Sequence, residues 1–105
     1  ADWMPLIDAP MHPEYPCAHC ISSAALGEVM ERVLGIGELA SPLSMSSPVG
    51  SDAQKRSWIR VSDFATELGN SRLWSGIHYR NSIAVGAAMG KQVGRYVLET
   101  TLKPR

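Results

Sequence analysis

The chain has 105 residues, of which 45% are hydrophobic and 19% are charged. This composition is typical of a single globular domain and excludes a disordered chain. Ten basic residues balance ten acidic ones, so no excess positive charge favours nucleic acid or an anionic membrane. No apolar run approaches the roughly 18 residues that span a bilayer. We therefore expect one domain, residues 1–105, that neither binds nucleic acid nor crosses a membrane.

The first third of the chain divides into an arm and a helix. Residues 1–16 hold four prolines, a density that prevents a helix and favours an extended, proline-rich arm. Residues 17–34 have a helical pattern, because apolar residues recur every four positions, at Ile21, Ala25, Val29 and Val33. Glycines at 35 and 37 then end the predicted helix.

Residues 35–57 are predicted to form a loop region, because glycine, proline and serine interrupt every periodicity there. Residues 57–61 alternate too briefly to predict a strand. A loop of this length is unusual in a compact domain, so it indicates either a functional flap or an excursion from the core.

Two further helices are expected, over residues 62–75 and 79–98. Ser62 followed by Asp63 is typical of a helix N-cap with an acidic first turn. Gly86, Gly90 and Gly94 lie four residues apart in the last helix. Because a helical glycine costs about 1 kcal/mol relative to alanine, this ridge predicts close packing of another helix. The predicted fold class is therefore all-α, with three main helices and long loops.

Arg72 and His78 are the first candidate site residues. Arginine offers a planar fork of donors that suits tetrahedral oxyanions, and neutral histidine can act as nucleophile, proton carrier or ligand. A separation of six residues does not place two side chains on one helix face, but a helix ending near Gly76 would let His78 turn back. The alternative is an arginine at a helix end, where it stabilises the helix dipole, and a histidine satisfied by the backbone.

A second candidate group begins the first helix, where Cys17, Ala18 and His19 occupy the first turn. The N–H groups of a first turn can bind an anion. Cys17 and Cys20 could also form a redox-active dithiol, or bind zinc with His19 and either His12 or His78. Against both alternatives, the Cys-x2-Cys pattern occurs once only, with no second ligand pair. His12 is expected to be an exposed loop residue.

These two segments together resemble the vanadium-dependent haloperoxidase and type 2 phosphatidic acid phosphatase superfamily. Residues 15–19 (Tyr-Pro-Cys-Ala-His) are similar to the Pro-Ser-Gly-His segment of that family, and residues 71–78 are similar to its Ser-Arg-x5-His segment. The flanking residues 12–16 and 74–80 resemble those of the haloperoxidases within this superfamily. The resemblance extends from about Trp3 to about Leu98 and corresponds to the C-terminal half of such a helical bundle.

The resemblance implies a role for each candidate residue. His78 would be the ligand to vanadium, or the nucleophile toward phosphorus, and His19 would be the general acid or base. Arg72 would hold the oxygens of the anion, and the positions of Cys17 and Ala18 would add donors. The implied ligand is vanadate, as cofactor, or phosphate, and the implied reaction is peroxide-dependent halide oxidation or phosphate hydrolysis.

Three departures from the family pattern predict a weakened or incomplete enzyme. The family's Lys-x6-Arg-Pro segment has no match in this chain, Cys17 replaces a serine, and Ser82 stands where many members have an aspartate that orients the histidine. A thiol is a weaker donor than a hydroxyl. The alternative functions are a non-catalytic binding, storage or defence protein on the same scaffold, and a Cys-x2-Cys thiol-redox protein.

The expected partners follow from the apolar faces of the helices. Three helices with a glycine ridge cannot easily bury those faces alone, so we expect a homo-oligomer or a companion N-terminal chain. The chain starts at Ala1 rather than at methionine. We therefore expect a processed product, secreted or excised, whose compartment does not follow from the sequence.

Overall fold

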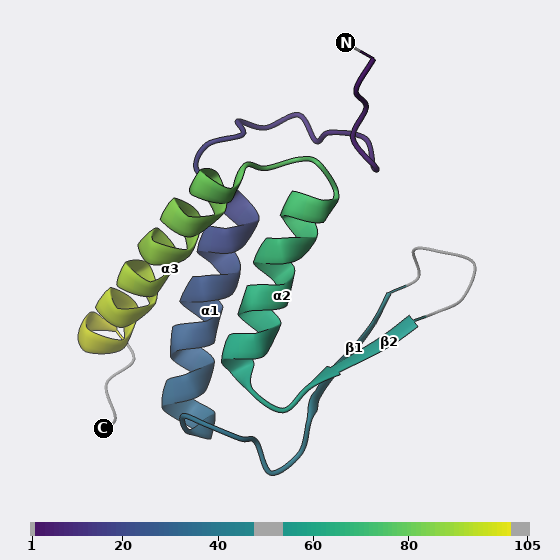
Figure 1. Cartoon of the computed structure of the whole chain (residues 1–105). Helices are drawn as coiled ribbons and strands as arrows, with labels where there is room; N and C mark the ends of the chain where they lie inside the picture. The colour runs from purple at the N-terminus through teal and green to yellow at the C-terminus, as the bar shows by residue number, and fades with distance from the viewer. Residues whose placement is uncertain (1, 48–53, 102–105) are drawn as a thin grey trace.

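The structure, a computed structural model, describes residues 2–47 and 54–101, which form an N-terminal arm, three helices and one β-hairpin. Helix α1 spans Ala18–Leu34, α2 spans Val61–Trp74 and α3 spans Arg80–Thr100. Figure 1 shows α1 between the other two helices, with the N-terminal arm crossing their upper ends. The predicted helices over 17–34, 62–75 and 79–98 are confirmed to within two residues at each end.

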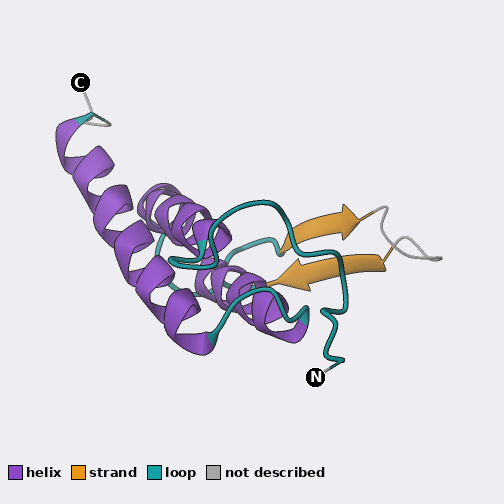
Figure 2. Cartoon of the chain, turned by 90° about the horizontal axis from the view of Figure 1, so that it is seen from above, coloured by secondary structure: helices purple, strands orange, loops and turns teal. Residues whose placement is uncertain are grey.

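The hairpin corrects the expectation of an all-α fold. Strands β1 (Leu43–Ser47) and β2 (Gln54–Trp58) pair antiparallel, with Leu43 opposite Trp58. The prediction of a loop over 35–57 missed them because β1 is rich in serine and β2 is mostly polar. One serine pair lies across the strands, with the Ser44 and Ser57 hydroxyls 2.8 Å apart. The hairpin extends to one side of the helices (Figures 1 and 2), and Arg56 and Trp58 of β2 contact Glu67 of α2. Residues 48–53, also part of the predicted loop region, lie outside the described residues.

The start of α2 differs from the prediction. The helix begins at Val61, with Arg60 at the N-cap, and Arg60 makes no capping hydrogen bond through its side chain. Ser62, the predicted N-cap, therefore lies inside the first turn. Val61 is 2% exposed, so burial of this apolar side chain against α1 explains why the helix begins earlier than its capping signal.

The glycine ridge of α3 contacts α1 directly. A Cβ atom at Gly86 would lie 2.6 Å from the Cys17 carbonyl oxygen, and one at Gly94 would lie 2.8 Å from that of Ala25. Gly90 is tighter still, against the Ile21 carbonyl. The three glycines are buried, so the predicted close packing of a second helix is confirmed, and α1 is that helix.

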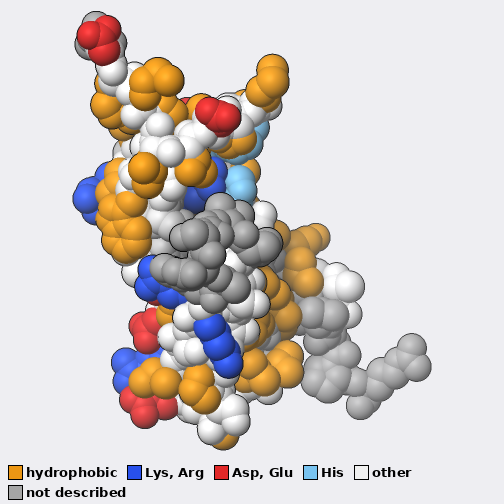
Figure 3. Space-filling view, turned by 90° about the vertical axis from the view of Figure 1, so that its right-hand side faces the viewer, with side chains coloured by type: hydrophobic (Ala, Val, Ile, Leu, Met, Phe, Trp, Pro, Cys, Tyr) orange, Lys and Arg blue, Asp and Glu red, His pale blue; other side chains and the backbone are white. Residues whose placement is uncertain are grey.

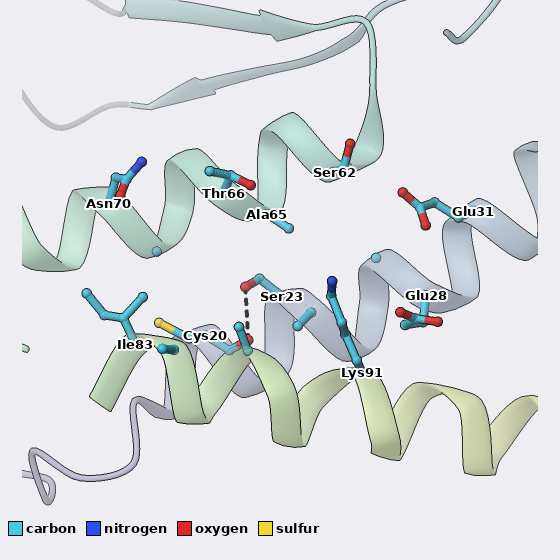
Figure 4. A pocket seen from close by; sticks show the side chains of 15 residues that line it. Cys20, Ser23, Glu28, Glu31, Ser62, Ala65, Thr66, Asn70, Ile83 and Lys91 are labelled. Carbon is cyan, nitrogen blue, oxygen red and sulfur yellow. Dashed lines mark hydrogen bonds between the residues drawn. The ribbon is translucent and has the colours of Figure 1, made fainter. Parts of the chain in front are cut away.

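The helices leave much apolar surface uncovered. Among the described hydrophobic residues, those that are buried are Cys17, Cys20, Ala24 and Val61. A groove of about 260 Å³ separates α2 from the α1–α3 pair. Figure 4 shows Ala65 and Thr66 of α2 on one side of it, facing Ser23 of α1 and Ile83 of α3 on the other. No helix in the described ranges is long and apolar enough to cross a membrane.

The N-terminal arm lies across the turn between α2 and α3. The Leu6 N–H donates to the Ser75 carbonyl at 3.1 Å. A Cβ atom at Gly76 would lie 2.7 Å from the Trp3 ring, so the arm and the turn are in direct contact. Seen from above in Figure 2, the arm forms an arch over the helix ends. The arm therefore covers the end of the bundle that carries Arg72 and His78.

Replacement of Gly90 by alanine should destabilise the chain. The new methyl group would overlap the Ile21 carbonyl and lie 2.8 Å from the Ala24 Cβ, and overpacking of this kind costs about 1–3 kcal/mol. Gly27→Ala is the matched control, because its Cβ would make ordinary contacts at 3.8 and 3.9 Å and gain up to about 1 kcal/mol of helix propensity. Urea unfolding followed by circular dichroism measures both variants. Equal stability of the two variants would contradict close packing at the ridge.

Candidate functional site

The turn after α2 brings Arg72 and His78 together. Gly76 has a φ of 72°, a left-handed conformation that suits glycine. The N–H groups of Ile77 and His78 both donate to the Arg72 carbonyl, at 3.2 and 3.3 Å. The helix therefore ends just before Gly76 and the chain turns back toward Arg72, as the sequence predicted.

The His78 imidazole is held by the N-terminal arm. The residue is 4% exposed, and its Nδ1 lies 2.6 Å from the Glu14 carbonyl oxygen. A carbonyl can only accept, so we assign the proton to Nδ1, which leaves the lone pair on Nε2. The Ser82 hydroxyl donates to the same carbonyl at 2.7 Å. Ser82 and His78 thus share the Glu14 carbonyl, and this shared acceptor orients the imidazole ring.

Glu14 is the residue that the sequence did not single out. Its carboxylate accepts the Tyr79 N–H at 2.9 Å. This hydrogen bond is the main cause that lowers the pKa of Glu14 below its usual range. The carboxylate also lies 3.4 Å from His78 Nδ1. Its contribution to the site comes largely from a backbone carbonyl, which every residue has, so no sequence pattern could have indicated it.

The three histidines of the chain meet at this end of the bundle. The His12 ring centroid lies 5.6 Å from that of His19 and 5.6 Å from that of His78, with the His12 and His78 rings nearly parallel. One ring nitrogen from each histidine lies within 4.8 Å of one from each of the others. His12 is half-buried, which corrects the expectation of an exposed loop residue. Histidine surface is visible below the arm in Figure 3, beside positively charged surface.

Arg72 is close enough to change the protonation of His19. Desolvation lowers the pKa of His19, and the positive charge of Arg72 lowers it further, with smaller effects from the other two histidines. Arg72 itself is half-buried, and its Nε is buried without a hydrogen-bond partner among the described residues. His19 is therefore neutral at neutral pH, next to a guanidinium with an unused donor.

Cys17 and Cys20 form a disulfide across the first turn of α1. Cys17 is the N-cap of this helix, and its sulfur accepts the Cys20 N–H at 3.1 Å. A disulfide sulfur has no proton, so the side chain of Cys17 cannot donate to an anion, which corrects that expectation. Ala18 is exposed as the first residue of α1, and its position can donate only through the backbone N–H.

The disulfide also argues against the two thiol alternatives. Thiol–disulfide exchange requires an accessible sulfur, whereas Cys17 is 0% and Cys20 is 2% exposed. A zinc site that uses these two cysteines requires them as thiolates, and neither cysteine is free. With the disulfide formed, the described groups at this end of the bundle that can still bind a ligand are the histidines, Arg72 and the N-terminus of α1.

Arg72→Gln should raise the pKa of His19 toward its ordinary value, because the substitution removes a nearby positive charge. The folded-state pKa of His19 is lowered, so its protonation opposes folding as the pH falls below about 6.5, and the variant should lose part of this acid sensitivity. An NMR titration of the His19 ring protons measures the change. Arg32→Gln, in the last turn of α1, is the control for loss of one charge. An unchanged His19 midpoint in Arg72→Gln would contradict the coupling.

Solved structures of bacterial vanadium-dependent haloperoxidases have a similar fold. The crystal structure of the first bacterial vanadium-dependent iodoperoxidase matches 92% of this chain at 30% identity with a TM-score of 0.77. Holo and apo structures of a bacterial vanadium-dependent chloroperoxidase match 93% at 22% identity with a TM-score of 0.76. The chain spans 23% of the length of each of these proteins.

No curated protein sequence matches the chain. The family model of the VCPO second helical-bundle domain matches residues 1–104. This match covers both candidate segments, the arm and all three helices, and it agrees with the structural similarity. The chain therefore belongs to the family of the VCPO second helical-bundle domain, within the vanadium haloperoxidase and type 2 phosphatidic acid phosphatase superfamily.

Proposed function

We propose that this domain binds a tetrahedral oxyanion, vanadate or phosphate, between Arg72, His78 and the start of α1. The observation that carries the proposal concerns two of the three buried, unsatisfied side-chain atoms among the described residues: Arg72 Nε, a donor, and His78 Nε2, a lone pair. Buried polar atoms of this kind are rare and require an explanation. A bound anion that accepts from arginine and is ligated by histidine satisfies both.

Each residue has a distinct part in this proposal. Arg72 would donate N–H groups to the anion's oxygens, and His78 Nε2 would contact the central atom, as ligand to vanadium or nucleophile toward phosphorus. His19, kept neutral by its lowered pKa, could take or return a proton at the anion. The first-turn N–H groups of Ala18 and His19 would add donors where the helix dipole favours negative charge. In the haloperoxidase family, bound vanadate is the cofactor for the oxidation of a halide by peroxide.

Affinity should be modest in this chain alone. It has no Lys-x6-Arg-Pro segment, and the disulfide removes the side-chain donor at Cys17. A hydrogen bond to a charged group is worth about 1.5–3 kcal/mol, so the loss of two or three weakens anion binding by several orders of magnitude. We therefore propose a degenerate or incomplete enzyme of the haloperoxidase or phosphatase type.

A non-catalytic binding protein is the second candidate. The specific observation in its favour is the buried Cys17–Cys20 disulfide, which stabilises the start of α1 but takes a donor from the anion. On this alternative, the domain binds an oxyanion or a partner without turnover. Halide oxidation with peroxide, or phosphate-ester hydrolysis, by the vanadate- or phosphate-binding protein would exclude it.

Calorimetric titration of the purified chain with orthovanadate tests the proposal. Arg72→Gln and His78→Ala should each weaken binding by about 10- to 100-fold, since each removes one charge-assisted or ligating contact. Arg32→Gln, on the last turn of α1, should leave the affinity unchanged. Vanadate binding that is unaffected by both site substitutions, or absent from folded wild-type protein, would contradict the proposal.

The missing donors and the uncovered surface lead us to propose an assembly, either a homo-oligomer or a complex with a companion chain. Large apolar side chains remain exposed on the arm and on α1, including Met4, Leu6 and Val33, at 74–80%. Sedimentation velocity over a dilution series should give a mass above 11.4 kDa, the mass of one chain. A folded, soluble monomer at every concentration would contradict a homo-oligomer. The complex with a companion chain would then be tested by co-purification.

A further inference from the structure

One member of the histidine cluster, His12, has no role in oxyanion binding as proposed above. Its Nε2 is buried and without a hydrogen-bond partner within the described ranges, as is that of His78. We propose that His12, His19 and His78 form a binding site for a divalent transition-metal ion, with zinc as the preferred occupant. This inference rests on the cluster geometry and does not depend on the oxyanion proposal, and because both assign His78 Nε2 to their ligand, the ion and the oxyanion are alternative occupants.

The hydrogen bonds of two of the rings leave the correct nitrogens available. Nδ1 of His12 lies 3.1 Å from the Pro13 carbonyl oxygen, and Nδ1 of His78 lies 2.6 Å from the Glu14 carbonyl oxygen. A carbonyl partner fixes the proton on Nδ1, so both lone pairs are on Nε2. Metal-binding histidines have this arrangement, with one nitrogen donating to a carbonyl or carboxylate and the other on the metal.

The distances are within reach of a shared ion. Ring nitrogens of the three residues lie within 4.8 Å of one another, whereas two nitrogens bound to one tetrahedral zinc at about 2.0–2.1 Å are about 3.3 Å apart. His78 is buried and fixed, but His12 lies in the arm and His19 is exposed at the start of α1. Small rotations of His12 and His19 toward His78 would close the site.

The charges around the cluster allow a cation but do not favour it strongly. The positive charge of Arg72 acts on His19 and would repel a metal ion. The Glu14 carboxylate lies 3.4 Å from His78 Nδ1 and offsets this charge. Imidazole ligands select zinc, copper or nickel over magnesium and calcium. Three histidines would leave a fourth position open, as in catalytic zinc sites.

The test is a calorimetric titration of the oxidised chain with zinc chloride, without reductant or phosphate. We expect one ion per chain, and His12→Ala should weaken binding by at least about 100-fold, because loss of an outer-shell partner alone costs about 10- to 100-fold. Glu31→Gln is the control for a carboxylate on α1 outside the cluster, and it should bind zinc as the wild type does. Zinc binding that is unchanged in His12→Ala would overturn the proposal.

Arg72→Gln separates this inference from the oxyanion proposal. Removal of the arginine should tighten zinc binding, because it removes a repulsive charge, and should weaken vanadate binding, because it removes a donor. A cobalt(II) titration gives a second readout that does not depend on any variant. Visible absorption of a four-coordinate ion without a thiolate charge-transfer band is the expected spectrum. A thiolate band, or metal binding only after reduction of the disulfide, would assign the metal to the cysteines and overturn the proposal.

Discussion

The close approach of α3 to α1 is the constraint on which the rest of the structure depends. Gly86 lies against the Cys17 carbonyl, and the Cys17 N–H donates to the Ser82 carbonyl at 3.3 Å. These contacts fix the first turn of α1, which carries His19, against the first turns of α3, just after His78. A side chain at Gly86 would push the two helix starts apart. The contact at Gly86 therefore sets how closely the helix start that carries His19 approaches the helix start that follows His78.

The second constraint is the convergence of hydrogen bonds on Glu14. Its carbonyl accepts from His78 and from Ser82, while its carboxylate accepts the Tyr79 N–H. One residue of the arm thus fixes the ring orientation of His78 and the start of α3 together. Ser82 bonds to the same carbonyl as His78, so the orientation of the His78 ring depends on the backbone of the arm.

The sequence could predict those parts of the fold and site that depend on local chemistry. Helical periodicity predicted the three helices, and the four-residue glycine spacing predicted the close packing. Gly76 predicted the turn that brings His78 back to Arg72. The β-hairpin was missed because β2 has no hydrophobic alternation and β1 alternates only briefly, over Leu43 to Ser46. The prediction that His12 is exposed was wrong. The sequence of an extended arm does not indicate which helix ends the arm crosses.

The Glu14 contribution was not predictable for a related reason, since it is a carbonyl whose partners lie far away in the chain. The same applies to Cys17, for which the sequence indicated a donor in place of serine, with half of a redox-active dithiol or a zinc ligand as alternatives. The structure selects the disulfide. Which member of such a set occurs depends on burial and on the chain conformation around it, neither of which is encoded in the spacing.

The hydrogen bonds at Glu14 also have a consequence for the order in which the molecule folds. They join residues 64 to 68 positions apart, and contacts of such long sequence separation close late, because the entropy of loop closure is lost before they form. The helices consist of local contacts and can form without them. The histidine cluster should therefore be among the last parts of the chain to assemble, and a chain with all its helices in place could still lack its site.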